Sequence, residues 1–225
     1  MMSDESHTSL PPLPRPRADL AARIRSRIVP DEAASRGPSG PSRWLYGVAA
    51  VGAMLMAVAV MMGTQVASQP MRSSVVALGG LLLVAAATFI ALVRSGSARV
   101  GVGARLALAL LPGLAFLVLS WLAYGALPPV AVGDAHISMP ACLVRGLVLA
   151  SIPMAVLVVV WRRTDPFTPR LTGAIIGGWA GLTGTIGLTM ACPSTDPLHI
   201  IIGHGAAIVG GALVGSLLGR RLLSP

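Results

Sequence analysis

Six long apolar runs dominate this sequence, and they restrict what the chain can fold into. They lie at residues 44–63, 73–93, 106–126, 141–161, 171–191 and 199–219. A helix of about 20 residues, rising about 1.5 Å per residue, crosses a hydrocarbon core of about 30 Å. Only short connections separate the runs, so no second soluble domain fits between them. The sequence therefore predicts an all-α, polytopic membrane protein with six transmembrane helices.

The composition supports this fold class and argues against a nucleic-acid-binding protein. Of the 225 residues, 54% are hydrophobic and only 11% are charged, and the mean hydropathy is +0.78. A soluble domain with this composition would expose a large apolar surface. The net charge of +9 comes from arginines that mostly fall between the apolar runs. We interpret it as a topology signal and expect no direct nucleic-acid partner.

The arginines also predict how the chain is oriented. Every basic residue is an arginine, and with six spans all 17 except Arg72 and Arg145 fall on one side of the membrane. Arginine is enriched on the cytoplasmic side of membrane proteins. Both termini are therefore expected in the cytoplasm, with the protein in the inner membrane of a bacterium. Removing or adding one span would move Arg162, Arg163 and Arg170 to the other side and break the pattern.

Residues 1–43 differ in composition from the rest of the chain. They are rich in proline, glycine and serine on both sides of residues 18–29, where apolar side chains recur at every fourth position. We expect a mostly disordered cytoplasmic segment that contains one short amphipathic helix. The six-helix transmembrane domain follows at residues 44–221, and residues 222–225 form a cytoplasmic tail.

A helix over residues 18–29 would carry an apolar stripe beside basic faces. The candidate partner-binding residues are Leu20, Ile24 and Ile28 on the stripe, with Arg23 and Arg27 next to it. A helix of about 12 residues is marginal alone in water, so this one is expected to fold on a partner or a surface. Two occupants fit equally well: a protein groove with an acidic rim, or anionic lipid.

Small residues line the last two predicted helices. Gly177, Gly181 and Gly184 lie along residues 171–191. The last helix carries a small residue at every fourth position: Gly203, Ala207, Gly211, Gly215 and Gly219. Small residues allow helix backbones to approach each other in lipid. The two helices are therefore expected to pack tightly, either against each other or, as a homodimer, against a second copy of the chain.

The two cysteines are predicted to lie at the same level of the membrane. Cys142 begins the run 141–161 and Cys192 follows the run 171–191, and the short cytoplasmic turn between these runs makes their helices antiparallel. Both thiols then lie on the outer side. A disulfide requires Cα atoms about 4.4–6.8 Å apart, which adjacent helix ends can reach, and an oxidising extracytoplasmic compartment would allow one.

Histidines near the same surface make a metal ion a second candidate partner of these thiols. The candidate metal ligands are Cys142, Cys192, His199 and His204. Such ligands suit a soft or borderline cation, and a transient metal ion is the only cofactor we expect. No CxxC, HxxxH or HExxH motif occurs, so the spacing is not diagnostic. Alternatively, His199 and His204 are interfacial and hydrogen-bond the carbonyls after Cys192. Arg145 can reach outward to water or pair with Asp134 or Asp196.

An ordered set of motifs in the C-terminal half resembles one known family. The set is Cys142, Ser151-Ile152-Pro153, Arg170-Leu171-Thr172-Gly173, Cys192-Pro193, Gly203-His204-Gly205 and Gly219-Arg220-Arg221-Leu222-Leu223. It closely resembles the NrsF family of negative regulators of a sigma factor over residues 142–223. The six-helix plan resembles that family more loosely, and the functionally comparable CarR of myxobacteria has the same general plan.

The resemblance implies a function. Proteins of this family are integral-membrane anti-sigma factors and not enzymes. They hold an extracytoplasmic-function (ECF) sigma factor at the membrane, away from core RNA polymerase, and release it on an envelope stress such as heavy metal, oxidant or photooxidation. By the same resemblance, Cys142 and Cys192 match the family's cysteine pair, proposed to sense the signal, and His204 matches the histidine of its Gly-His-Gly motif. Residues 1–43 depart from the family, because they are longer and richer in proline than its usual N-terminal segment.

Two other functional classes remain open: a small multi-pass transporter and a membrane assembly subunit. Proton or cation coupling usually needs an acidic residue near the middle of the membrane, and the apolar runs contain none. No nucleophile–base pair with a recognisable spacing occurs, so no catalytic residue is expected. An anti-sigma factor would carry a bound sigma factor, whereas the other two classes would not.

Overall fold

The computed structural model describes residues 40–61, 75–94, 101–125, 138–163, 165 and 167–224. All of them belong to one compact unit, Gly37–Pro225. The partner-binding residues expected in the N-terminal segment lie outside the described residues, so the helix over residues 18–29 stays a prediction. The described residues are helical and contain no strand.

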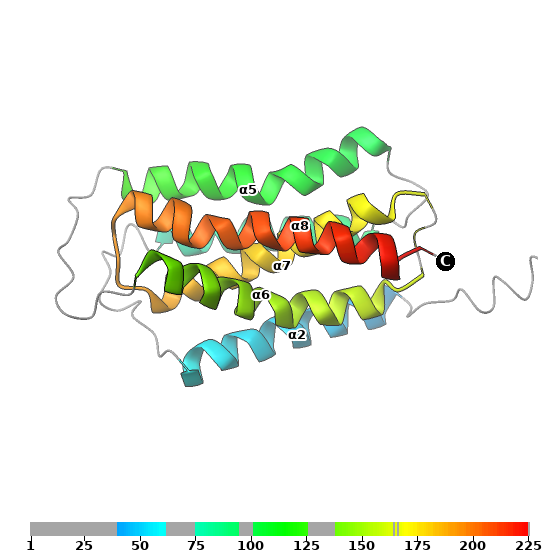
Figure 1. Ribbon diagram of the computed structural model, residues 1–225, viewed down its shortest axis with the longest axis horizontal. Helices are drawn as coiled ribbons and strands as arrows, with labels where there is room; N and C mark the ends of the chain where they lie inside the picture. The colour runs from blue at the N-terminus through cyan, green and yellow to red at the C-terminus, as the bar shows by residue number, and fades with distance from the viewer. Residues whose placement is uncertain are drawn as a thin grey trace, which may run out of the picture. The chain divides into compact units, whose positions relative to one another are not determined.

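Six helices of the described chain are long and apolar enough to cross a membrane (Figure 1). They are α2 (Gly40–Met61), η2 with α4 (Val75–Gly79 and Gly80–Arg94), α5 (Val102–Tyr124), α6 (Met139–Val160), α7 (Pro169–Ala191) and η3 with α8 (His199–His204 and Gly205–Leu222). The elements η2 and η3 are short π-helical turns that continue directly into α-helices. For the described residues, the prediction of an all-α fold with six helices long and apolar enough to span a membrane is confirmed.

Helix α7 lies at the centre of the bundle. Its span is 89% buried, whereas the other five spans are 22–39% buried. It packs against α2, α4, α5, α6 and α8. The surrounding helices expose large apolar side chains such as Leu83, Leu110 and Val159. This distribution is what lipid requires, because the outer surface faces hydrocarbon and the polar groups must find partners inside the bundle.

Glycines bring α7 and α8 into backbone contact. A Cβ atom added at Gly177 would overlap the carbonyl oxygen of Gly211, and one added at Gly215 would overlap the carbonyl oxygen of Gly173. Lipid provides no hydrophobic force between helices, so this close approach stabilises the pair through dispersion contacts. The small-residue seam of α8 is therefore occupied by α7 of the same chain, which is the intramolecular one of the two alternatives.

The polar side chains of α7 are hydrogen-bonded inside the bundle. The indole nitrogen of Trp179 donates to the Ala85 carbonyl of α4 at 2.8 Å, and the Thr185 hydroxyl donates to the His204 carbonyl of η3 at 2.9 Å. Thr189 donates to the Thr185 carbonyl, also at 2.9 Å. A buried polar group without a partner costs about 1–3 kcal/mol. These bonds therefore allow a helix rich in threonine to occupy the centre.

The glycine contact can be tested by substitution. We expect Gly177→Ala to destabilise the protein by about 1–3 kcal/mol, because the new methyl group meets a backbone carbonyl that cannot rotate away. The matched control is Gly113→Ala in α5, where an added Cβ meets no atom within 4 Å. Thermal unfolding of both variants in the same detergent measures the difference. Equal unfolding midpoints would contradict the close contact.

Candidate functional site

Polar side chains gather at both ends of the bundle. The Cys/His cluster consists of Cys142, Cys192, His199 and His204. The Arg/Asp cluster, at the opposite end of α7, consists of Arg105, Asp165, Thr168 and Thr172. The sequence analysis named all members of the first cluster and missed the second.

The two cysteines are attached to hydrogen-bonded helix ends. Cys142 lies in the first turn of α6, and its amide donates to the Ser138 carbonyl at 3.1 Å. Cys192 directly follows α7, and its amide donates to the Leu188 carbonyl at 2.7 Å. The two helices run in opposite directions, so the start of one lies beside the end of the other. The expectation that both thiols reach the same level agrees with this arrangement.

A second glycine contact sets how closely these two helix ends approach. A Cβ added at Gly184 of α7 would come within 2.8 Å of the Gly146 carbonyl oxygen of α6. One added at Gly146 would come within 2.7 Å of Leu188 Cδ1. Gly146 lies one turn after Cys142, and Leu188 lies one turn before Cys192. The close contact of α6 and α7 therefore continues up to the cysteines.

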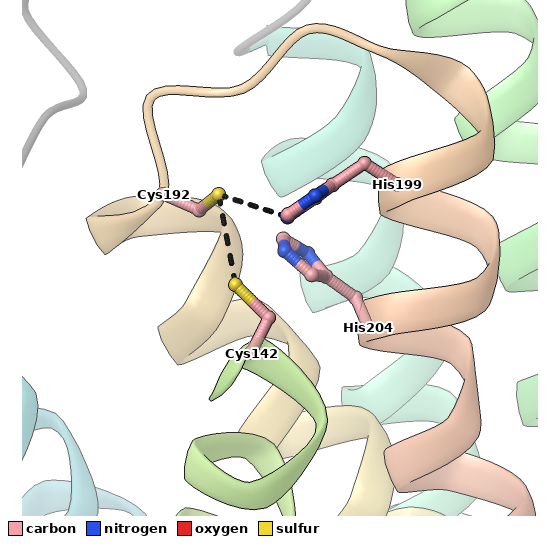
Figure 2. A group of neighbouring side chains, drawn as sticks. All are labelled: Cys142, Cys192, His199 and His204. Carbon is pink, nitrogen blue, oxygen red and sulfur yellow. Dashed lines mark hydrogen bonds between the residues drawn. The ribbon is translucent and has the colours of Figure 1, made fainter. Parts of the chain in front are cut away.

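The π turn η3 directs both histidines to the same side. Residues five apart in an α-helix point about 140° away from each other. A π turn closes its hydrogen bonds between residues five apart and is wider. His199 and His204 therefore both face the thiols (Figure 2), with their ring centroids 5.7 Å apart. Asp196 fixes the start of this turn, because its carboxylate accepts the amides of Leu198 and His199 at 3.1 and 3.2 Å.

The four side chains form one compact, buried group. Cys142 Sγ lies 4.0 Å from Cys192 Sγ, and Cys192 Sγ lies 3.6 Å from His199 Nε2 (Figure 2). No two of the four potential ligand atoms are more than 4.8 Å apart. Each residue is at most 4% exposed, and the thiols are not bridged. This group could hold a metal ion, and a disulfide could form if the two sulfurs approached from 4.0 Å to about 2.0 Å.

The electrostatics of the cluster favour a thiolate at Cys192. A hydrogen bond from the Cys142 thiol lowers the pKa of Cys192; burial acts in the opposite direction, and the nearby His204 adds to the lowering. A thiolate is both the nucleophile in disulfide chemistry and the form that binds metals. The cluster is therefore suited to either reaction.

The histidines do not adopt the interfacial alternative. His199 Nε2 contacts the Cys192 sulfur. Both ring nitrogens of His204 are buried without a hydrogen-bond partner. His199 Nε2 and both ring nitrogens of His204 are therefore not bonded to the described carbonyls after Cys192. Among the described residues Arg145 is exposed and forms no ion pair with Asp196, while Asp134 lies outside the described residues.

The Arg/Asp cluster contains a buried ion pair. Arg105 Nη1 lies 3.0 Å from Asp165 Oδ2, and the two side chains are 6% and 1% exposed. Arg105 also donates to the Thr168 hydroxyl, and the Thr172 hydroxyl donates to Asp165. The sequence analysis placed Arg105 in the connection before residue 106, but α5 begins at Val102 and includes it. The helix extends because Asp165 neutralises an arginine that would otherwise have to remain in water.

Backbone hydrogen bonds extend this cluster to the end of α8. The Asp165 amide donates to the Leu223 carbonyl at 3.2 Å, and the Arg163 amide donates to the Leu222 carbonyl at 3.0 Å. Together with the side-chain bonds of Arg105 in α5 and Thr172 in α7, these backbone bonds link α5, α7 and α8 to the connection that contains Asp165. In the sequence, Asp165 is the only acidic residue between Arg163 and Arg170. Nothing in the sequence indicates which arginine it binds.

Asp165 remains ionised despite its burial. Burial alone would raise the pKa of Asp165, but the Thr168 amide, the Thr172 hydroxyl, the Phe167 amide and the Arg105 charge together hold that pKa below its usual range. The stabilisation from this ionised carboxylate is complete above its unfolded-state pKa of about 3.9 and is lost as the pH falls below that value.

Comparison with known proteins now decides the family. The chain matches the family model described as NrsF, negative regulator of sigma F, over residues 31–224. It belongs to the NrsF family. The match covers all the described helices and agrees with the motifs noted in the sequence. Members of the NrsF family are negative regulators of a sigma factor, which is a regulatory and not an enzymatic class. Neither the curated proteins nor the solved structures include a significant match to the chain.

The ion pair of this NrsF family member yields a prediction about stability. Asp165→Asn leaves the buried Arg105 charge without its partner, and we expect a loss of about 3–5 kcal/mol at neutral pH. Arg170→Gln, which removes an exposed charge nearby, should change stability by less than about 1 kcal/mol. Thermal unfolding in detergent measures both changes.

Two further measurements separate the ion pair from a general effect of substitution. The double variant Arg105→Met/Asp165→Asn should recover part of the loss, because no unpaired charge remains. Wild-type protein should also lose stability as the pH falls below about 4, and Asp165→Asn should lack this step. If Asp165→Asn and Arg170→Gln unfold at the same temperature, the pair does not stabilise the fold.

Proposed function

We propose that this protein is an integral-membrane anti-sigma factor that holds an ECF sigma factor at the bacterial inner membrane and releases it on envelope stress. The family match carries the proposal. A buried pair of thiols 4.0 Å apart supports a sensing role, because such a pair can react with oxidants or soft cations. The arginine distribution supports cytoplasmic termini. In that orientation the Arg/Asp cluster faces the cytoplasm and the Cys/His cluster faces outward.

The proposed sensing reaction takes place between Cys142 and Cys192. A peroxide or a comparable oxidant removes two electrons and two protons from the thiols, and a sulfur–sulfur bond of about 2.0 Å forms. The sulfur atoms must approach from their present 4.0 Å separation. A soft metal cation that binds both thiolates would change the same contact. Either event shifts the start of α6 relative to the end of α7.

The proposed transmission runs along α7. This helix begins at Pro169 beside the Arg/Asp cluster, to which it contributes Thr172, and ends at Ala191, next to Cys192. Its backbone contact with α8 makes the two helices move as one unit, and both ends of that unit contact a polar cluster. A rigid element that two sites both contact can couple them. A tenfold loss of affinity for the sigma factor requires only about 1.4 kcal/mol of coupling.

Capture of the sigma factor is assigned to residues 18–29. Leu20, Ile24 and Ile28 would occupy an apolar groove of the partner, and Arg23 and Arg27 would face its acidic rim. We propose no homodimer through the small-residue seam of α8, since α7 already occupies that surface.

The first test is the bound partner. Full-length protein extracted from unstressed membranes in mild detergent should bring down the sigma factor encoded beside its gene. The amount recovered should fall after the cells are exposed to an oxidant or a heavy metal. Purification without any sigma factor under both conditions would contradict the proposal and favour a transporter or an assembly subunit.

The thiols give a second prediction. Cys142→Ser/Cys192→Ser should still capture the sigma factor, because the glycine contacts that position α6, α7 and α8 are unchanged. Induction of a sigma-dependent reporter by oxidant should be abolished. The control is Ser151→Ala, an exposed position of α6 whose hydroxyl bonds only its own helix. Normal induction in the double variant would exclude the thiols as sensors.

The N-terminal segment gives a third prediction. Ile24→Asp in the full-length protein places a charge on the apolar stripe and should weaken sigma-factor binding at least tenfold, which corresponds to about 1.4 kcal/mol. Ser26→Asp adds the same charge on the opposite side of the predicted helix and should have a much smaller effect. Binding measured with purified sigma factor compares the two variants. If Ile24→Asp binds normally, the cytoplasmic connections must form the binding site instead.

A further inference from the structure

Two distances within the Cys/His cluster are close to those of a tetrahedral zinc site, and no pair of the four ligand atoms is more than 4.8 Å apart. With Zn–S bonds of about 2.3 Å and Zn–N bonds of about 2.0–2.1 Å, an ideal tetrahedron has an S–S edge of about 3.8 Å and S–N edges of about 3.6 Å. The Cys142–Cys192 sulfur distance is 4.0 Å, and Cys192 Sγ lies 3.6 Å from His199 Nε2. A disulfide would need a much larger approach of the two sulfurs, to about 2.0 Å. The arrangement therefore suits an ion better than a bridge.

Charge balance also favours a divalent cation in this position. The four residues are at most 4% exposed, so a net charge there would be costly. Two thiolates neutralise one Zn²⁺ ion, and two neutral imidazoles add no charge. Binding requires both sulfurs as thiolates, releases to water any protons that they still carry and leaves a neutral complex.

His204 provides an independent indication of a ligand. Both of its ring nitrogens are buried and, among the described residues, neither lies within hydrogen-bonding geometry of a partner, although the ring points toward the thiols (Figure 2). Buried polar groups in native proteins nearly always have partners. A metal ion would supply the missing partner of one of the two ring nitrogens.

The backbone around the histidines is held in position. The Asp196 carboxylate accepts the His199 amide, and the His204 carbonyl accepts the Thr185 hydroxyl. With four protein ligands, the coordination shell has no open position. Closed shells of this kind are structural or regulatory and not catalytic. Two thiolates with two imidazoles select zinc or a softer ion over magnesium or calcium.

We propose that Cys142, Cys192, His199 and His204 are the four ligands of one resident Zn²⁺ ion, which keeps the two thiols apart until an oxidant or a softer cation displaces it. The regulatory half of this proposal rests on the proposed function. In the oxidative case, the thiolates give two electrons to a peroxide and form the S–S bond. The peroxide O–O bond breaks, two protons complete two water molecules, and Zn²⁺ leaves.

The metal is tested on the purified full-length protein. After purification in detergent with a reductant and removal of loose metal, elemental analysis should find one zinc per chain. His204→Gln and Cys142→Ser should each lower zinc affinity at least tenfold, and Ser151→Ala, at an exposed position of α6, should not. Cobalt substituted into the wild type should show the visible absorption of a tetrahedral thiolate site. Zinc-free wild-type protein that also fails to bind added zinc or cobalt would overturn the proposal.

The proposal that the zinc ion protects the two thiols from oxidation is tested by the rate at which peroxide forms the disulfide. His204→Gln keeps both thiols. A changed rate of disulfide formation in this variant therefore reflects loss of the metal and not loss of a sulfur atom. Peroxide should form the disulfide at least tenfold faster in this variant and in wild type treated with a zinc chelator than in zinc-loaded wild type. Equal rates in all three would overturn the protective role. Size-exclusion profiles identical to wild type exclude misfolding of the variant.

The same preparations distinguish this inference from the proposed function. Protein that carries a sigma factor but binds no zinc would overturn the inference and leave the anti-sigma function intact. Protein that binds zinc in the predicted ratio but never binds a sigma factor would support the metal site and contradict the proposed function.

Discussion

The backbone contact between α7 and α8 is the interaction on which the rest of the structure depends. Glycines at positions such as 173, 177, 211 and 215 allow two helices to approach until carbonyl oxygens meet Cα atoms. Helix α7 is therefore enclosed by other helices. Its Trp179 and Thr185 side chains hydrogen-bond α4 and η3, whereas Thr183 and Thr189 bond carbonyls of α7 itself. Because η3 is continuous with α8, the same contact also places His199 and His204 beside Cys192. One packing interaction thus brings together side chains of the Cys/His cluster that come from different helices.

The hydrocarbon core of a membrane restricts where polar and charged side chains can lie in such a bundle. Charged groups lie at the helix ends, and the buried ones are paired, as Arg105 and Asp165 show. The Cys/His cluster follows the same rule if its thiolates are balanced by a divalent cation. Each cluster contains residues from several helices. A chemical change in either cluster therefore alters how those helices pack. In a regulator of a sigma factor, such a change offers a route from an outer signal to an inner partner.

The six long helices could be predicted from the sequence, because hydrophobic runs of about 20 residues report directly on membrane-spanning length. The orientation expected from the arginines stays a prediction. The antiparallel direction of the helices that position Cys142 and Cys192 follows from the short turn that joins them. The π turn could not be predicted, since the segment from His199 to His204 is also compatible with an α-helix, which would separate the two rings. The Arg105–Asp165 pair was missed because it joins positions 60 residues apart, and hydropathy carries no information on such contacts. Binding of the sigma factor by Leu20, Ile24 and Ile28 remains a prediction.

The central claim is that chemistry at the Cys/His cluster changes the affinity for a sigma factor on the other side of the membrane. The most direct test measures the Kd of the full-length protein in lipid nanodiscs for the sigma factor encoded beside it. The measurement is made with the thiols reduced and again after peroxide has formed the disulfide, confirmed by mass spectrometry. The account predicts at least tenfold weaker binding after oxidation, corresponding to about 1.4 kcal/mol of coupling. An unchanged Kd with the disulfide fully formed would contradict it.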